Sequence, residues 1–474
     1  MAVSVVVRRD SYADSVALMG LSQRLQALPG VRQAYVVMGT EMNRQMLDGV
    51  GLLTPEAAQA RAVDLIIAVE GDAVEAALLS LDEGAPRSSQ GAAAAVAVPR
   101  TVEAAVRLDP GLNLALISVP GAYAAREARA ALHQGLHVML FSDNVPVEAE
   151  VSLKRLAHER RLLLMGPDCG TAIIDGVGLG FANAVRRGNI GIVAASGTGA
   201  QEISCLIDRL GGGVSQLIGV GGRDLSGPVG GQMTLDALER LQTDSGTDVI
   251  VLVSKPPDPT VAGRLRQAAL RGRKPVVICL LGGHEALTLD EAAMRALALA
   301  TGLTQEQMEK RLGRAVAPVP VAAGRRGIRG LFCGGTLCQQ ALQLVGGDHE
   351  FIDLGGDQFT VGRSHPMIDP SLRCQYLREA SAAGAAAVLL DVVLGYGAHP
   401  DPAGALAEPI AEAVAAGVAV VASVTGTEQD PQRLSVQAAT LRRAGAAVLP
   451  TARQAALTAA ASVRDVGGDG HVRQ

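Results

Sequence analysis

The stretch that most constrains the fold covers residues 188–224 and reads GNIGIVAASGTGAQEISCLIDRLGGGVSQLIGVGGRD. An apolar run at 190–194 predicts a strand, and apolar residues over 203–210 recur at the spacing of an amphipathic helix. The glycine turn at 196–199 joins them and leaves backbone N–H groups accessible at the helix N-terminus, where an anion is stabilised. An ordinary capped helix of an α/β domain is the alternative explanation of this turn.

The same pattern occurs again at residues 328–357, which read IRGLFCGGTLCQQALQLVGGDHEFIDLGGD. An apolar strand again leads into a Gly-Gly-Thr turn and an amphipathic helix. A Thr-x-x-Gln capping box is predicted at each helix start. Its residues are Thr198 and Gln201 in the first copy and Thr336 and Gln339 in the second. The chain therefore contains an internal duplication, and its two helix starts predict one shared anion site.

Composition excludes several classes of function. The 474 residues carry a net charge of −5 and only 2% aromatic residues, so neither a basic surface nor stacking platforms for nucleic acid are expected. No apolar run approaches the roughly 18 residues of a membrane span, so we expect a cytoplasmic protein without a membrane partner. The six cysteines lack CxxC or Cys/His spacing, so neither a metal site nor a disulfide framework is expected.

Strands alternate with helices along the whole chain, which indicates an α/β fold with parallel sheets. The first part, residues 1–95, is expected to form a small α/β domain. Residues 96–185 are expected to form a doubly wound unit, but no G-x-G-x-x-G motif lies at a first strand–helix turn in either part. A nucleotide or coenzyme A site there is therefore supported only by the type of fold.

Seven motifs spread over most of the chain resemble the FdrA family of the succinyl-CoA synthetase superfamily. They are MGPDCGTAI, ASGTGAQE, GVGGRDLS, VSKPPDP, GRSHPMIDP, LLDVVLGYGAHPDP and VTGTEQDPQ, in this order. The resemblance implies a Rossmann-like domain followed by two flavodoxin-like domains, with power helices starting at Thr198 and Thr336. The predicted units are then a small N-terminal domain (1–95), a Rossmann-like domain (96–185), flavodoxin-like domain 1 (186–301), a linker (302–327) and flavodoxin-like domain 2 (328–474).

The sequence also departs from that superfamily. Its acyl-CoA ligases carry a phosphorylatable histidine in a GHAGA-like loop, a glutamate that orients this histidine, and a nucleotide-grasping domain, and none of these is recognisable here. His284 stands in LLGGHEAL and is interpreted as a surface-loop histidine. We therefore expect no phosphohistidine on this chain.

The resemblance implies a carbamoyltransferase subunit that exchanges a carbamoyl group between oxalurate and phosphate, giving oxamate and carbamoyl phosphate. Phosphate and acyl phosphates would be the small-molecule substrates, other protein subunits would be partners, and no cofactor would be required. An acyl-CoA synthetase subunit that works with a separate nucleotide-binding subunit is the first alternative, and coenzyme A would bind only in that case. A non-catalytic scaffold of such a complex is the second alternative.

The candidate phosphate-binding residues belong to the two glycine turns, whose N–H groups can surround an anion. They are Ser196, Gly197, Thr198, Gly199, Gly334, Gly335 and Thr336.

The candidate catalytic residues are Lys255, Arg363 and His365. Lys255 follows an apolar strand and precedes two prolines that fix its direction. The guanidinium of Arg363 can grip phosphate or a carboxylate in a bidentate manner. His365 can donate to a carbonyl oxygen or transfer a proton to the leaving nitrogen. Solvated loop residues are the alternative for all three.

Five further residues are candidate substrate contacts, namely Arg223, Asp224, Asp168, Cys169 and Asp369. Each has a structural alternative. The aspartates can serve as turn or cap residues, and the same holds for Asp391 and Asp401. Cys169 lacks a recognisable histidine partner, so packing in a tight loop is the alternative to a nucleophile.

Overall fold

The computed structural model describes residues 2–9, 11, 15–26, 28–72, 99–282, 286–313, 318–347, 349–360 and 364–464. His284, Arg363 and the tail from 465 lie outside these residues. The chain divides into two compact units. The first consists of Met1–Val98 and Thr360–Ser364, and the second of Pro99–Phe359 and His365–Gln474.

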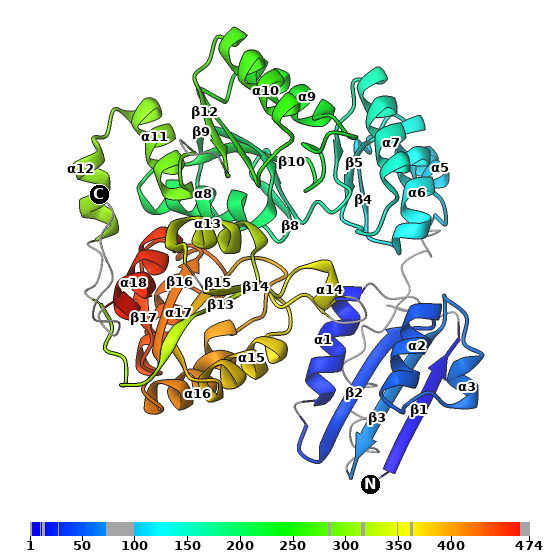
Figure 1. Cartoon of the computed structure of the whole chain (residues 1–474). Helices are drawn as coiled ribbons and strands as arrows, with labels where there is room; N and C mark the ends of the chain where they lie inside the picture. Colours follow the sequence, from blue (N-terminus) through cyan, green and yellow to red (C-terminus); the bar gives the residue numbers. More distant parts are fainter. Residues whose placement is uncertain are drawn as a thin grey trace. The chain divides into compact units, whose positions relative to one another are not determined.

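The first unit contains an antiparallel sheet with strand order β1-β3-β2 (Figure 1). Alternate residues of β2 are buried, while every residue of β3 is buried because β3 is the central strand and is covered on both faces. Leu18 and Leu25 of α1 pack with one face, and Leu47 and Leu52 lie in the cluster on the other. This confirms the small α/β domain at the N-terminus. Its elements are β1 (Ala2–Arg8), α1 (Ser15–Gln26), β2 (Val31–Met38), α2 (Glu41–Gly49), α3 (Pro55–Ala58) and β3 (Leu65–Gly71).

The second unit begins with a three-stranded parallel sheet in the order β4-β5-β6. Small residues on α6, such as Ala124, Ala128 and Ala131, are fully buried. They permit close approach of helix and sheet in a chain that is poor in aromatic residues. The elements are α5 (Val102–Leu108), β4 (Leu114–Ile117), α6 (Gly121–His133), β5 (His137–Leu140), α7 (Val147–Glu159) and β6 (Leu164–Met165).

A six-stranded sheet follows, in the order β12-β11-β9-β10-β7-β8. Its four strands β9 to β12 are parallel, and the antiparallel hairpin β7–β8 extends the sheet through β10. The hairpin lies before residue 185 in the sequence but pairs with the sheet of the next predicted unit. The elements are β7 (Thr171–Ile174), β8 (Val177–Gly180), β9 (Arg187–Ala195), α8 (Gly197–Arg209), β10 (Val214–Gly219), α9 (Gln232–Thr243), β11 (Val249–Ser254), α10 (Pro259–Arg271), β12 (Val276–Leu280) and α11 (Leu289–Thr301).

The last sheet is five-stranded and parallel, in the order β14-β13-β15-β16-β17. Its central strands β15 and β16 are buried along their whole length, as in parallel sheets covered on both faces. The elements are β13 (Arg326–Phe332), α13 (Gly335–Val345), β14 (Glu350–Asp353), α14 (Asp357–Thr360), α15 (Ser371–Ala382), β15 (Ala385–Val393), α16 (Pro402–Ala415), β16 (Ala419–Thr425), α17 (Leu434–Arg443), β17 (Ala447–Leu449) and α18 (Ala452–Arg464).

The two large sheets share one hydrophobic core. Apolar residues of α8 and α11, which cover one face of the six-stranded sheet, belong to the same buried cluster as residues of α13 and α18 on the five-stranded sheet. Figure 1 shows α8 in green and α13 in yellow where these two parts of the second unit meet. The α/β architecture with two duplicated parallel-sheet domains is therefore confirmed. Both large domains belong to one compact unit.

Part of the predicted linker is not a simple connection. Residues 305–312 form α12 (Gln305–Leu312), which begins with a capping box between Thr304 and Gln307. Met308 of this helix is almost completely buried and belongs to the shared core. Proline and alanine beyond this helix biased the sequence interpretation toward a linker, whereas the apolar contact of Met308 fixes the helix in place.

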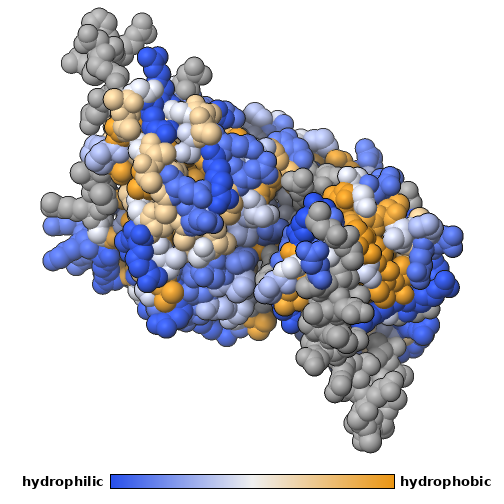
Figure 2. All heavy atoms as spheres, turned by 90° about the horizontal axis from the view of Figure 1, so that it is seen from below, coloured by the Kyte–Doolittle hydropathy of each residue, from blue (hydrophilic) through white to orange (hydrophobic). Residues whose placement is uncertain are grey.

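The hydropathy of the surface agrees with a chain that buries many of its apolar residues in these cores. In the view from below, blue hydrophilic residues cover much of the surface and orange apolar residues gather in smaller areas (Figure 2). None of the described helices combines the length and apolar character needed to cross a bilayer.

Candidate functional site

The start of α8 is formed by the turn after β9. The N-cap is Ser196, whose hydroxyl accepts a hydrogen bond from the N–H of Gly199 at 3.0 Å. The predicted capping box at Thr198 is therefore wrong. The side chain of Gln201 instead donates to the carbonyl of Phe181 at 2.6 Å. The helix begins before Thr198, because a serine in extended backbone conformation already satisfies the first-turn N–H.

The start of α13 is held in a different way. Its N-cap is Gly334, which has no side chain to accept a hydrogen bond, so the predicted box at Thr336 is also wrong. Asp391 at the end of β15 accepts the N–H of Cys333 and the N–H of Gly334, each at 2.8 Å. Asp391 is fully buried and forms an ion pair of 3.1 Å with Arg373. The sequence offered Asp391 as a turn or cap residue and gave no signal for Arg373.

The two helix starts are in direct contact. The hydroxyl oxygens of Ser196 and Thr336 lie 2.6 Å apart and are buried. A Cβ atom added to Gly334 would lie only 2.8 Å from the hydroxyl of Thr198, and one added to Gly199 would lie 3.0 Å from the methyl of Thr336. Glycine at both positions is therefore required for this close approach. The structure brings together the seven residues that were predicted to bind phosphate, and anion binding by them stays a prediction.

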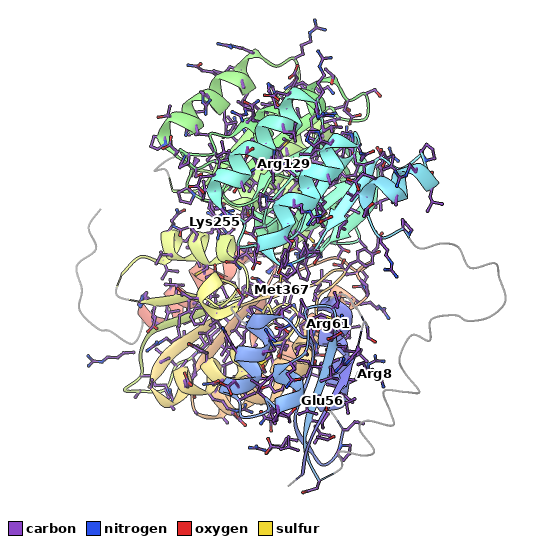
Figure 3. The ribbon with its side chains drawn as sticks, turned by 90° about the vertical axis from the view of Figure 1, so that its right-hand side faces the viewer. Arg8, Glu56, Arg61, Arg129, Lys255 and Met367 are labelled. Atoms are coloured by element: carbon purple, nitrogen blue, oxygen red, sulfur yellow. The ribbon has the colours of Figure 1, made fainter. Side chains whose placement is uncertain are left out.

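Lys255 lies beside this contact. It follows the last residue of β11 and is exposed to solvent. A Cβ atom on Gly335 would approach the Lys255 ammonium nitrogen to 2.5 Å and would overlap the Asp353 carboxylate. Figure 3 shows Lys255 beside the yellow ribbon of α13, where it borders the green part of the chain. A cation and a carboxylate thus flank the first turn of α13.

His365 is half-buried near the same turn. Burial, and to a smaller extent the charge of Arg373, lowers the pKa of His365 to about 4. Its Nδ1 atom accepts the N–H of Met367 at 3.2 Å, so the proton of the neutral ring resides on Nε2. A Cβ atom on Gly355 would lie 2.6 Å from this Nε2 atom and equally close to the carbonyl of Cys333. His365 is therefore a neutral hydrogen-bond donor at pH 7. The ring also packs against Phe181, with 6.1 Å between centroids.

Arg223 and Asp224 belong to a buried charge network. The carboxylate of Asp224 accepts from Lys154 at 2.7 Å and from the N–H and hydroxyl of Thr234. Arg223 donates to the carbonyl of Val145 and pairs with Glu150 at 3.0 Å. The prediction that Asp224 contacts substrate is wrong for this geometry, because its oxygens are fully buried and already paired. The network joins α7 to the loop after β10.

The other predicted substrate contacts also have structural partners. Burial raises the pKa of the Cys169 thiol to about 12, and the thiol faces the carbonyl of Thr171. A thiol that keeps its proton is a poor nucleophile, so the packing alternative holds for Cys169. Asp369 accepts the N–H of Ser371 at the start of α15, as a turn residue does. Asp168 remains exposed, with a left-handed backbone φ of 55°.

A buried polar network between the two large domains was not predicted. Asp430 accepts the side-chain amide of Asn183 at 2.9 Å and the N–H of Ala184 at 2.7 Å. Glu202 of α8 accepts the hydroxyl of Thr425 and the N–H of Ala452 at the start of α18. Burial raises the pKa of both carboxyl groups. Polar residues thus fix the relative position of the domains that carry the two helix starts.

Family models match both ends of the chain. Residues 331–462 match a model described as CoA-ligase. Residues 1–98 match a model described as AllF, heavy metal-associated domain.

A heavy-metal site does not fit the N-terminal residues. Residues 1–98 contain neither cysteine nor histidine, which are the soft and borderline donors that such metals prefer. Among the described residues, no group of three or more His, Cys, Asp and Glu side chains is arranged to hold a metal. We therefore derive no metal chemistry from this match.

Several proteins are similar to the chain in sequence. It is 45% identical over 493 residues to the uncharacterized protein YahF of Escherichia coli (strain K12), covering 94% of this chain and 95% of that protein. It is 30% identical to the mitochondrial succinate–CoA ligase [ADP-forming] subunit alpha-2 of Trichomonas vaginalis, over 38% of this chain and 59% of that one. It is 32% identical to the alpha subunit of the Aquifex aeolicus (strain VF5) enzyme, over 34% and 53%. The chain thus spans only part of the length of these ligase subunits.

Two of the similar solved structures superpose on this chain with low TM-scores. The apo acetyl-coenzyme A synthetase 1 of Ca. Korarchaeum cryptofilum gives a TM-score of 0.31 at 16% identity, with 75% of this chain and 83% of that chain covered. The ATP citrate lyase of Methanothrix soehngenii, in complex with citrate and coenzyme A, gives 0.36 at 18%, with 44% and 40% covered. TM-scores this low support no argument about this chain.

The sequence matches agree with the duplicated α/β architecture. The model described as CoA-ligase covers most of the second large domain, and the ligase alpha subunits match about a third of the chain. None of these descriptions contains the FdrA name, which stays a resemblance. The extensive match to YahF decides the family. The chain belongs to the family of YahF, within the succinyl-CoA synthetase-like superfamily.

Proposed function

We propose that this chain is a subunit of an acyl-transferring enzyme that binds phosphate or an acyl phosphate where the starts of α8 and α13 meet. The observation that carries the proposal is the 2.6 Å contact between the hydroxyls of Ser196 and Thr336, which joins two helix N-termini. Each N-terminus carries about half a positive charge and unpaired N–H groups. Two like partial charges held this close repel each other, and a bound anion would offset that repulsion.

The phosphate is assigned to the α8 side of this contact. Gly197 is exposed there, and a Cβ atom on it would meet only the hydroxyl of Thr171, at 3.6 Å. At the α13 side, Asp391 already accepts the N–H groups of the turn and Asp353 adds a second carboxylate. A dianion is therefore better placed at the start of α8. The exposed Lys255, whose ammonium lies beside the first turn of α13, would be its counter-charge across the contact between the two helix starts.

The transfer we favour is that of a carbamoyl group. In this reaction, the nitrogen of an amide such as oxamate attacks the carbonyl carbon of carbamoyl phosphate, and phosphate leaves with the bonding electron pair. The amide nitrogen loses a proton, and the product is oxalurate. Helix N–H groups and Lys255 would stabilise charge on the phosphate, while the Nε2–H of His365 would donate to the carbonyl oxygen. Arg363 is assigned to the carboxylate of the acceptor from the sequence alone.

The second candidate is an acyl-CoA synthetase subunit that works with a separate nucleotide-binding subunit. The match of residues 331–462 to the CoA-ligase model favours it. The sequence counts against it, because it has no recognisable phosphohistidine loop. Coenzyme A would be required only by this candidate. Partner subunits are part of both proposals, and a scaffold without chemistry is the third candidate.

The deciding experiment measures two reactions and the labelling of the chain with the same preparation, alone and together with the products of neighbouring genes. Carbamoyl phosphate formed from oxalurate and phosphate supports the first candidate. Coenzyme A-dependent phosphate release from ATP in the presence of a carboxylic acid, together with acid-labile labelling of the chain by labelled ATP, supports the ligase and contradicts carbamoyl transfer. Absence of both reactions, even with the partner subunits present, would leave only the scaffold. His284→Ala serves as a control that should retain carbamoyl transfer.

A further inference from the structure

The two helix starts are duplicated in sequence but are held by different devices. The start of α8 is capped by its own residue, Ser196. The start of α13 has a glycine at this position and takes its acceptor from the neighbouring strand. Two residues before its N-cap, the first copy has Ala194, which pairs with Val253 of the neighbouring strand. The equivalent residue of the second copy is Phe332, and because Leu331 pairs with Leu390, Phe332 lies opposite Asp391. Asp391 therefore stands where the first copy has Val253.

Asp391 is linked to the α8 start by a continuous series of contacts. It accepts the N–H groups of Cys333 and Gly334, and these residues enter the first turn of α13. In that turn, Gly334 packs against the side chain of Thr198. Thr336 makes the hydroxyl contact with Ser196, which caps α8.

The charge of Asp391 is balanced on its other side. Arg373 is 2% exposed, and its Nη2 atom donates to the carbonyl of Leu331 and pairs with Asp391. The Nε atom of Arg373 has no hydrogen-bond partner among the described residues. A buried arginine that leaves one donor unsatisfied carries a cost, so the pair is poor evidence for a purely stabilising role. Its geometry instead fixes the direction of two backbone N–H groups.

We propose that Asp391, held by Arg373, is a positioning residue that sets the start of α13 against the start of α8 and thereby shapes the anion site. The inference rests on the proposed function for the anion, but the placement of the turn can be measured independently. Asp391→Asn keeps the size of the side chain. It offers one acceptor oxygen to two N–H groups and directs its own N–H₂ at a donor.

The first experiment measures binding of inorganic phosphate by isothermal titration calorimetry. Asp391→Asn should weaken the affinity at least tenfold. Asp208→Asn is the matched control, because Asp208 is also buried, accepts the N–H of Arg186 at 2.9 Å and pairs with its guanidinium, but lies in the last turn of α8. It should bind phosphate within twofold of wild type. Equal affinity in Asp391→Asn and wild type would overturn the positioning role.

A double variant separates positioning from stability. Asp391→Asn alone leaves Arg373 as an unpaired buried charge, whereas Asp391→Asn with Arg373→Met removes both charges. The double variant should regain thermal stability relative to Asp391→Asn and still bind phosphate at least tenfold more weakly than wild type. Recovery of phosphate affinity together with stability would show that Asp391 is merely structural.

Hydrogen exchange supplies the measurement that does not depend on phosphate. Amides at 333–336 and at 197–199 should exchange at least tenfold faster in Asp391→Asn, and in the double variant, but not in Asp208→Asn. Failure of wild type to bind phosphate would refute the proposed function while this comparison still decides the positioning role. Unchanged exchange at 197–199 would refute the link between the two helix starts.

Discussion

At the scale of single residues, burial decides the chemistry that each candidate side chain can perform. His365 keeps a neutral ring because burial makes protonation costly, and the N–H of Met367 leaves the ring proton on Nε2. The same effect keeps the proton on the Cys169 thiol. The two residues were both candidates in the sequence, yet burial favours a donor in one case and removes a nucleophile in the other.

The depressed pKa of His365 predicts a pH dependence of stability. The unfolded ring takes up a proton near pH 6.5 and the folded ring near pH 4, so the unfolded state binds more protons in between. The stability contributed by His365 is therefore present above pH 6.5 and is lost as the pH falls toward 4. Between pH 6.5 and pH 4, the free energy of unfolding of wild type should fall by up to roughly 3 kcal/mol more than that of His365→Gln. Denaturant unfolding at pH 7, 5 and 4 measures this difference. An equal change of unfolding free energy with pH in the two proteins would contradict the prediction.

Lys255 should matter for rate and not for folding. Loss of a charge-assisted hydrogen bond to phosphate typically costs about 1.5–3 kcal/mol, so kcat/KM of Lys255→Ala should fall roughly tenfold to over a hundredfold. The thermal midpoint should change little, because Lys255 is exposed. Lys310→Ala, at an exposed position of α12, is the matched control and should keep wild-type rates. A wild-type rate in Lys255→Ala would place the anion elsewhere.

At the scale of elements, glycine makes the contact between α8 and α13 possible. The helix starts approach so closely that a Cβ atom on Gly334 would overlap Thr198. Short side chains at the contact have the same effect, since the hydroxyls of Ser196 and Thr336 touch directly. The close approach places the N–H groups of both helix starts side by side.

Substitution of Gly334 by alanine should therefore be destabilising, and because Gly334 is the N-cap, alanine brings no gain in helix propensity there. Overpacking at a closed contact typically costs about 1–3 kcal/mol, and phosphate affinity should fall as the helix starts separate. Gly263→Ala in α10 is the control, because a Cβ atom there meets nothing within 4 Å. That variant should gain roughly 0.5–1 kcal/mol. Chemical denaturation of the two variants measures both effects, and a stable Gly334→Ala protein would disprove the close contact.

At the scale of the whole second unit, the two large domains are joined by a shared apolar core and by buried carboxylates. Glu202 reaches from α8 to the ends of β16 and α18. Asp430 reaches from the second domain to the segment before β9. Neither contact involves neighbours in sequence. The helix starts are therefore presented on one fixed body, not on two independently moving domains.

The raised pKa of Glu202 predicts that its charge opposes folding. An acid whose folded pKa is raised stabilises the fold in its protonated form, and that contribution is lost as the pH rises through the folded value. Glu202→Gln should therefore melt at a higher temperature than wild type at pH 8, because the amide can accept from Ala452 and donate to Thr425. The difference should shrink at pH 4.5. A lower midpoint for Glu202→Gln at pH 8 would show that the carboxylate is compensated.

The sequence by itself determined the order of strands and helices, the duplication and the position of the two helix starts. These features follow from hydrophobic periodicity and glycine turns, which are local and repeat in the chain. It did not determine the caps, because Ser196 and Thr198 both lie where a cap can form and only the backbone conformation selects one. The tertiary structure decided that Asp391 accepts the N–H of Cys333, 58 residues away, and so holds the α13 turn. It also decided that Lys154 donates to Asp224, 70 residues away. A buried charge takes the partner that folding brings within about 3 Å, and no local pattern encodes which one that is.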